Sequence, residues 1–116
     1  MDKMKNLTEA ISELVIQEYD RATVKFGAKH NGPHEAYAVI LEEFEEAQYC
    51  IGCLEYEIAH FWGAVKKNKI DTCEGTPEEI KIAAIQAAAE LIQVAAMAHK
   101  AQLGFMCDER AMKVKE

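Results

Sequence analysis

A dense group of glutamates is the first feature of this chain that could do chemistry. Glu42, Glu43, Glu45 and Glu46 occupy four of five consecutive positions. In a helix, residues four apart lie on one face, so Glu42 and Glu46 align, and Glu35, seven residues before Glu42, joins them. Like charges at this spacing repel each other, so the group is either a solvated face or a site for a hard cation such as Mg²⁺ or Mn²⁺. The spacing alone favours these two interpretations about equally.

A second, isolated carboxylate lies much later in the chain. Between residues 82 and 98 only Gln86, Glu90 and Gln93 are polar, and their spacing of four and three residues predicts one stripe that Lys100 extends. A carboxylate in apolar surroundings must be neutral, paired or bound to a metal ion. Glu90 therefore pairs with an arginine, lysine or tyrosine, faces solvent through a gap, or shares a cation with the first glutamate group. Helix bundles commonly build metal sites from side chains on facing helices.

The elements that position these groups are predicted to be helices, because no run of residues alternates with the period of a strand. A first helix is expected over residues 7–26, ended by Gly27. A second helix is expected to begin at Pro33 and to break or bend near Gly52. Residues 54–67 keep the helical period in either case.

The isolated carboxylate belongs to a last long helix. Residues 66–75 are polar and predict a loop. Thr76 is a helix cap, followed by proline at the first helical position and by Glu79, which completes a capping box. We expect this helix to cover residues 77–103 and to stop at Gly104.

Length and composition predict a single all-α domain over residues 1–116, with ends at 1–6 and 105–116 that fray or form at most a short helix. The net charge of −7 argues against a nucleic-acid partner, which needs a basic surface. We find neither a signal-peptide core nor a stretch apolar enough to span a bilayer, so we expect a cytoplasmic protein without a membrane partner.

The four cysteines are expected to be free thiols in that compartment. Cys50 and Cys53 form a CxxC pair, but Cys73 and Cys107 are far apart and provide no second pair for a structural zinc site. Thioredoxin-type redox chemistry is disfavoured because no βαβ pattern surrounds the pair.

Taken together, these motifs resemble the MazG-like, all-α nucleoside triphosphate pyrophosphohydrolases. The hallmark of that family is EExxE on one helix and ExxD on a later one. Residues 42–46 match the first part, and residues 90–93 match the second part except for Gln93 at its last position. The flanking runs 34–40 and 93–98 also resemble small bacterial and phage-type members, and the likeness covers about residues 10–103.

The resemblance implies a four- to five-helix bundle whose subunits associate through helices as a homodimer or homotetramer. It implies cleavage of a nucleoside triphosphate between its α- and β-phosphates, which gives the monophosphate and pyrophosphate in nucleotide-pool housekeeping. Mg²⁺, or alternatively Mn²⁺, would be the cofactor.

Residue roles carry over by position in the motif. The expected metal ligands are Glu42, Glu43, Glu46, Glu90 and Gln93. The first three of these are also the expected catalytic residues, which hold the metal ion or activate water. Contacts to the substrate are expected from the following residues: Lys100, Glu35 and His34.

Two departures from the family pattern matter. Gln93 can ligate Mg²⁺ through its amide oxygen, but it brings no charge and cannot act as a base. The separation between Glu46 and Glu90 is also longer than is usual in the family. An alternative is therefore a non-catalytic helical oligomer that binds a nucleotide or a protein partner. A ferritin-like redox site is disfavoured, because these helices carry no Glu-x-x-His pair.

Overall fold

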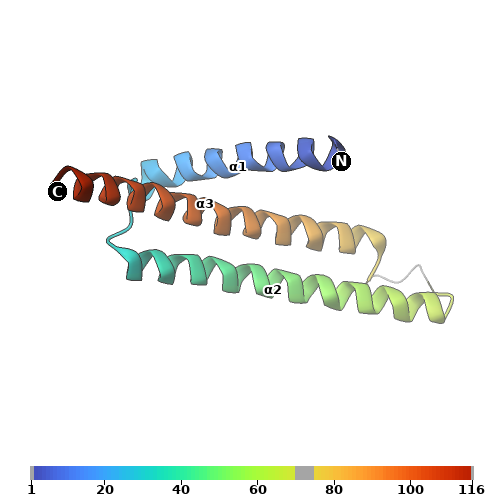
Figure 1. Ribbon diagram of the computed structural model, residues 1–116. Coiled ribbons are helices and arrows are strands. Elements are labelled where there is room, and N and C mark those ends of the chain that lie inside the picture. The colour runs from blue at the N-terminus through green and yellow to red at the C-terminus, as the bar shows by residue number, and fades with distance from the viewer. Residues whose placement is uncertain (1, 70–74, 116) are drawn as a thin grey trace. The chain divides into compact units, whose positions relative to one another are not determined.

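The structure, a computed structural model, describes residues 2–69 and 75–115, with side chains up to residue 105. These residues form three helices, α1 (Asp2–Phe26), α2 (Pro33–Lys66) and α3 (Pro77–Lys115), and no strand within the described ranges (Figure 1). The all-α prediction is confirmed. By their internal contacts the residues group into two compact units, unit 1 (Met1–Glu42 with Ile92–Glu116) and unit 2 (Glu43–Leu91).

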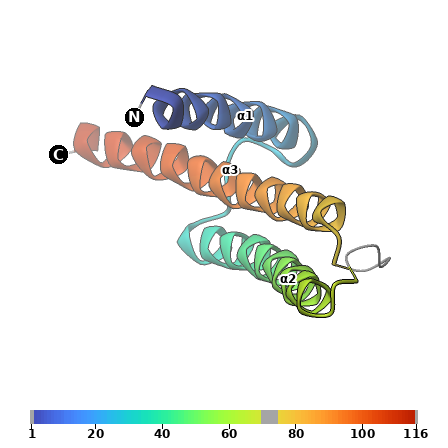
Figure 2. The same ribbon diagram turned by 90° about the vertical axis from the view of Figure 1, so that its right-hand side faces the viewer.

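Unit 1 combines α1 with the first turns of α2 and the C-terminal part of α3, and α1 lies beside α3 in both views (Figures 1 and 2). Its core is small: Ala22, Ala96 and Met97 are buried, and four half-buried side chains pack around them, namely Val15, Tyr19, Val39 and Ile40. The Tyr19 ring also meets the His99 ring edge to face, at 4.9 Å between centroids. Aromatic contacts of this geometry stabilise a helix pair beyond the area that they bury.

Unit 2 is formed by the rest of α2 and the first half of α3, which lie side by side. All of its buried hydrophobic side chains among the described residues are small: Ala47, Ala64, Ala83 and Ala87. Alanine brings little apolar area, but it lets helix backbones approach each other closely. This close approach is what positions carboxylates from α2 and α3 near one another.

The turn before α3 follows the expected capping chemistry. Glu79 N donates to Thr76 Oγ1 at 3.2 Å, and Ile80 N donates to Thr76 O at 3.0 Å. Gly75 has φ +67°, and a Cβ at this position would lie 2.5 Å from His60 Cβ. The Gly75 N–H donates to Glu57 Oε2 at 2.8 Å. Only glycine satisfies this backbone conformation and this contact together.

Several predicted helix ends were wrong. The start of α1 lies at Asp2 rather than at residue 7. For α2 the expectation left open a break near Gly52 or a continued helix, and the structure has the continued helix, which extends to Lys66. Likewise α3 passes Gly104 and continues to Lys115. A glycine inside a helix costs only about 1 kcal/mol, which neighbouring turns and packing readily outweigh. The described residues therefore form three long helices, fewer than the four to five that were expected.

Other boundaries were predicted correctly. Gly27 ends α1 with φ +90°, and its N–H donates to Thr23 O at 2.9 Å, which is a typical C-terminal cap. The starts of α2 at Pro33 and of α3 at Pro77 were also as expected. Of the predicted loop at 66–75, residues 70–74 lie outside the described residues.

One part of α3 corrects the expectation that no stretch could span a bilayer. Pro77–Phe105 is long and apolar enough to do so by length and composition, and 22 % of its most apolar window is buried. The core helix of a soluble protein passes the same test, so this property alone is weak support for a membrane location.

Candidate metal-binding site

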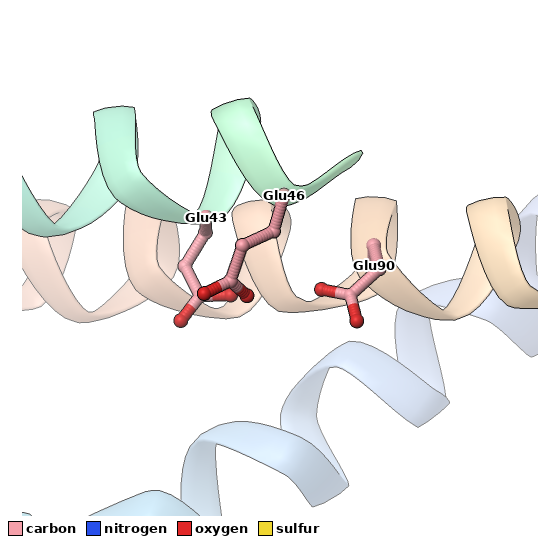
Figure 3. Close-up of side chains that lie close together, drawn as sticks. All are labelled: Glu43, Glu46 and Glu90. Carbon is pink, nitrogen blue, oxygen red and sulfur yellow. The ribbon is translucent and has the colours of Figure 1, made fainter. Parts of the chain in front are cut away.

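Three glutamates of unit 2 converge on one point. Glu43 and Glu46 extend from α2, three residues apart and therefore on one face, and Glu90 extends from α3. One carboxylate oxygen from each lies within 4.8 Å of the others. Figure 3 shows the three carboxylates turned toward the same space between the two helices. Glu43 and Glu90 are half-buried, while Glu46 is exposed.

The carboxylate cluster (Glu43, Glu46 and Glu90) affects the pKa of a neighbouring thiol. The pKa of Cys50 is raised, first by burial of the thiol and then by the negative charges of Glu90, Cys53 and Glu46. Both causes disfavour a thiolate. The pKa of Cys50 thus reports negative potential around the cluster, and the thiol itself is not set up as a nucleophile at neutral pH.

The donor set of the cluster fits a hard divalent cation. Carboxylate oxygens are the ligands that Mg²⁺ and Mn²⁺ prefer, and Mg²⁺ usually keeps several waters beside one or two carboxylates. In the part of the chain that the structure describes, no lysine or arginine forms an ion pair with Glu46 or Glu90. A bound cation would offset the mutual repulsion of the three groups.

Three other residues predicted for the site do not belong to the cluster. Glu42 is exposed. Glu35 is half-buried in unit 1, where its carboxylate lies 3.9 Å from Nδ1 of His30. His34 is exposed at the start of α2. The functional roles expected of Glu42, Glu35 and His34 stay predictions.

Gln93, which replaces the family's usual aspartate, has a partner in unit 1. Its Nε2 donates to Glu18 Oε2 at 2.7 Å, and Arg21 Nη2 donates to the same oxygen at 2.7 Å. Hydrogen bonds from Arg21 and then from Gln93 lower the pKa of Glu18. An aspartate at position 93 would instead put a second negative charge against Glu18. The predicted ligation of a metal by Gln93 stays a prediction.

Glu18 is a residue that sequence reasoning missed. It lies on α1, 75 positions before its amide partner, and nothing in its local sequence distinguishes it from other helix-surface glutamates. Only the packing of α1 against α3 within unit 1 brings the two residues together.

Lys100 was predicted to contact a phosphate, and it is only 6 % exposed. It lines a cavity of about 70 Å³ in unit 1 together with Lys29, His30 and Gly32 from the loop before α2. The same cavity is bounded on α3 by residues that follow Lys100: Ala101, Gly104 and Phe105.

Comparisons with known proteins found no relative of this chain. No protein-family model matches the sequence, and neither a curated protein nor a solved structure is significantly similar to it. The resemblance to the MazG-like family therefore rests on the glutamate motifs and on the runs of residues that flank them.

Proposed function

We propose that this protein is a Mg²⁺-dependent nucleoside triphosphate pyrophosphohydrolase of the MazG-like kind. The observation that carries the proposal is the convergence of Glu43, Glu46 and Glu90, because one EExxE segment and one later glutamate provide all three ligands. These three residues are among the five metal ligands that the resemblance in sequence implies.

The chemistry of the cluster suits phosphate-ester hydrolysis. Mg²⁺, when bound, neutralises phosphate charge and lowers the pKa of a coordinated water. The carboxylates of Glu43, Glu46 and Glu90 would hold the ion. A carboxylate of this group that does not ligate the ion can accept the proton of the attacking water.

The direct test is pyrophosphate release from a panel of ribo- and deoxyribonucleoside triphosphates with Mg²⁺, Mn²⁺ or EDTA. We expect metal-dependent formation of pyrophosphate and the matching monophosphate. Glu46→Gln and Glu90→Gln should each lower the rate about 100-fold or more, because each removes a charged oxygen from the site. Glu45→Gln, the matched control on the exposed side of α2, should keep its activity. Full activity in Glu90→Gln would contradict the proposal.

A second function, binding without catalysis, is favoured by one observation. Gln93 donates to Glu18, so the position that supplies a carboxylate in the family here serves a structural hydrogen bond. In that case calorimetry should detect a nucleotide with Mg²⁺ bound to the protein, while no monophosphate forms. Turnover that is lost in Glu90→Gln would exclude this alternative.

The proposal includes a cytoplasmic location and assembly of the chain as a homodimer or homotetramer. Its described side chains include no large hydrophobic group that is fully buried, and many large apolar groups are exposed, Trp62 at 59 % and Ile85 at 60 % among them. Association of three-helix subunits would cover such groups and would also supply the further helices of a four- to five-helix bundle.

A further inference from the structure

The cavity around Lys100 has the features of a binding site for a small anion. We propose that Lys100, Lys29 and the N-terminal end of α2 bind a phosphate group, and that they do so without the metal ion. The proposal does not depend on the pyrophosphohydrolase activity, because every residue involved belongs to unit 1 and none belongs to the carboxylate cluster.

The buried lysine is the strongest observation. Only 6 % of Lys100 is exposed, yet no described residue forms a hydrogen bond or an ion pair with its ammonium group. Among the described residues every fully buried side-chain nitrogen has a hydrogen-bond partner, so this ammonium group still reaches solvent at the cavity. A charge with so little water around it is stabilised by a partner of opposite sign. Since Lys100 lines the cavity, a bound anion is the compensation that the geometry allows.

Two further positive groups border the same space. Lys29 lines the cavity from the loop that precedes α2. Gly32, the residue just before the first residue of α2, lines it as well, so the positive end of a 34-residue helix faces the cavity. Gly32 has φ +108°, and no atom lies within 4 Å of the place where a Cβ would be, so this edge of the cavity is open.

His30 lines the cavity without offering a free ring nitrogen to a ligand. Nε2 of His30 lies 3.5 Å from the carbonyl oxygen of Met97, and its Nδ1 lies 3.9 Å from the Glu35 carboxylate. Both ring nitrogens therefore face acceptors of the protein, and His30 acts as a wall. Glu35, the acidic group near the His30 ring, does not line the cavity.

Charge indicates that a phosphate group is the part of a ligand that enters the cavity. The cavity has a volume of about 70 Å³, which is more than one water molecule needs. Two ammonium groups and the positive end of α2 match the negative charge and the several acceptor oxygens of a phosphate. The protein has a net charge of −7, so a general attraction for anions cannot account for binding here.

The test is a titration of the full chain in EDTA at low ionic strength, followed by calorimetry and by NMR of the backbone amides. The probes are inorganic phosphate, a nucleoside monophosphate and acetate. We expect saturable phosphate binding that shifts the amide signals of Gly32, Ala101 and Gly104. Lys100→Met should weaken it about ten- to a hundredfold, as expected for loss of one charge-assisted hydrogen bond. Lys81→Gln, an exposed lysine of α3 in unit 2, is the matched control and should bind normally.

The remaining outcomes identify the source of the phosphate or contradict the proposal. Tighter binding of the monophosphate than of inorganic phosphate would identify a nucleotide as the ligand, and equal binding would identify free phosphate. No saturable binding, equal affinity for acetate, or unchanged affinity in Lys100→Met would overturn the proposal. If Lys100→Met does not fold, as judged by circular dichroism, the exposed Lys29→Gln takes its place and should still weaken binding several-fold.

Discussion

At the scale of single residues, two of the clustered carboxylates, Glu46 and Glu90, act electrostatically on Cys50 within unit 2. Burial of the thiol and the charges of Glu90, Cys53 and Glu46 raise the pKa of Cys50. Any change that removes negative charge from the cluster should therefore lower the pKa of Cys50 toward its ordinary value. Cys50 thus offers a measure of the cluster's charge that does not depend on catalysis.

Glu90→Gln should make Cys50 more reactive. The substitution removes one raising influence and leaves burial in place, so more thiolate is present at about pH 8, and each unit of pKa is worth about tenfold in thiolate. We expect a several-fold faster reaction with iodoacetamide, measured by mass spectrometry of the peptide that carries Cys50. Glu55→Gln removes an equal charge from an exposed position of α2 and should change little. An unchanged rate in Glu90→Gln would contradict this account.

Addition of Mg²⁺, like Glu90→Gln, should make Cys50 more reactive. A cation held by Glu43, Glu46 and Glu90 cancels negative potential, which lowers the pKa of Cys50 and speeds alkylation. The rate should rise to a plateau with Mg²⁺ concentration and return to its starting value when EDTA removes the ion. In Glu46→Gln the plateau should move to a much higher concentration. A rate that does not respond to Mg²⁺ would argue against a metal site.

Gln93→Asp, which restores the family motif, should destabilise unit 1. The pKa of Glu18 is lowered by its hydrogen bonds from Arg21 and Gln93, so their stabilisation is present above the unfolded-state pKa and is lost as the pH falls through the folded-state value. An aspartate removes one donor and adds repulsion, at a cost of about 1–2 kcal/mol near neutral pH. The loss should shrink in acid, where the two carboxyls can share a proton.

Urea unfolding at about pH 7 and pH 4 measures this effect. Gln102→Asp, at an exposed position of α3 within the same unit, makes the same chemical change away from Glu18 and should cost little at either pH. Equal stability of Gln93→Asp and Gln102→Asp would show that the hydrogen bond to Glu18 does not contribute to the free energy of unfolding.

At the scale of helices, local sequence patterns predicted the starts of α2 and α3 and the end of α1. Proline at the first helical position, Thr76 as a cap and Gly27 as a stop are signals written in a few adjacent residues, and all three predictions were correct. Local patterns could not decide whether α2 breaks at Gly52, and they did not predict that α3 passes Gly104. In both helices the outcome depends on the stability of the turns on both sides, which outweighs one glycine.

For the candidate site, too, local patterns predicted one part and packing decided the rest. The EExxE spacing was enough to predict a carboxylate site, but helical phase alone puts Glu46 beside both Glu42 and Glu43. Which of the two joins Glu90 depends on the face of α2 that packs on α3 in unit 2, and that is a tertiary property. The bond between Gln93 and Glu18 is equally a product of packing, in unit 1.

Two glycines of unit 2 give opposite predictions. Gly52 lies inside α2, and no atom lies within 4 Å of a Cβ built there, so Gly52→Ala should raise the free energy of unfolding by about 1 kcal/mol. Gly75→Ala should lower it by about 2 kcal/mol or more, because φ is +67° and the new Cβ would overlap His60. Thermal unfolding by circular dichroism measures both. A break of α2 at Gly52 would reverse the sign of the first effect.

At the scale of the whole chain, small buried groups contrast with large exposed ones. Most of the buried hydrophobic residues are alanines, whereas Trp62, Tyr49, Val24 and Phe26 are all more than half exposed. Apolar side chains stabilise a fold in proportion to the area removed from water, so a monomer of this composition has little driving force. A partner surface is therefore expected, either a second copy of the chain or a bilayer along Pro77–Phe105.

Self-association is the outcome that we predict, and Ile85→Glu tests it. Ile85 is 60 % exposed on α3, so in a monomer a glutamate there should cost no more than about 0.5 kcal/mol. If a second copy covers Ile85, the charge would be buried, and sedimentation should show dimers or tetramers of the wild type dissociating in the variant. Thermal stability of the wild type should rise with protein concentration, as it does when folding is coupled to assembly. Gln86→Glu adds the same charge at the next, exposed position and should leave assembly intact. A wild-type chain that sediments as a monomer at all concentrations, and whose single tryptophan, Trp62, responds only when lipid vesicles are added, would instead identify the bilayer as the partner.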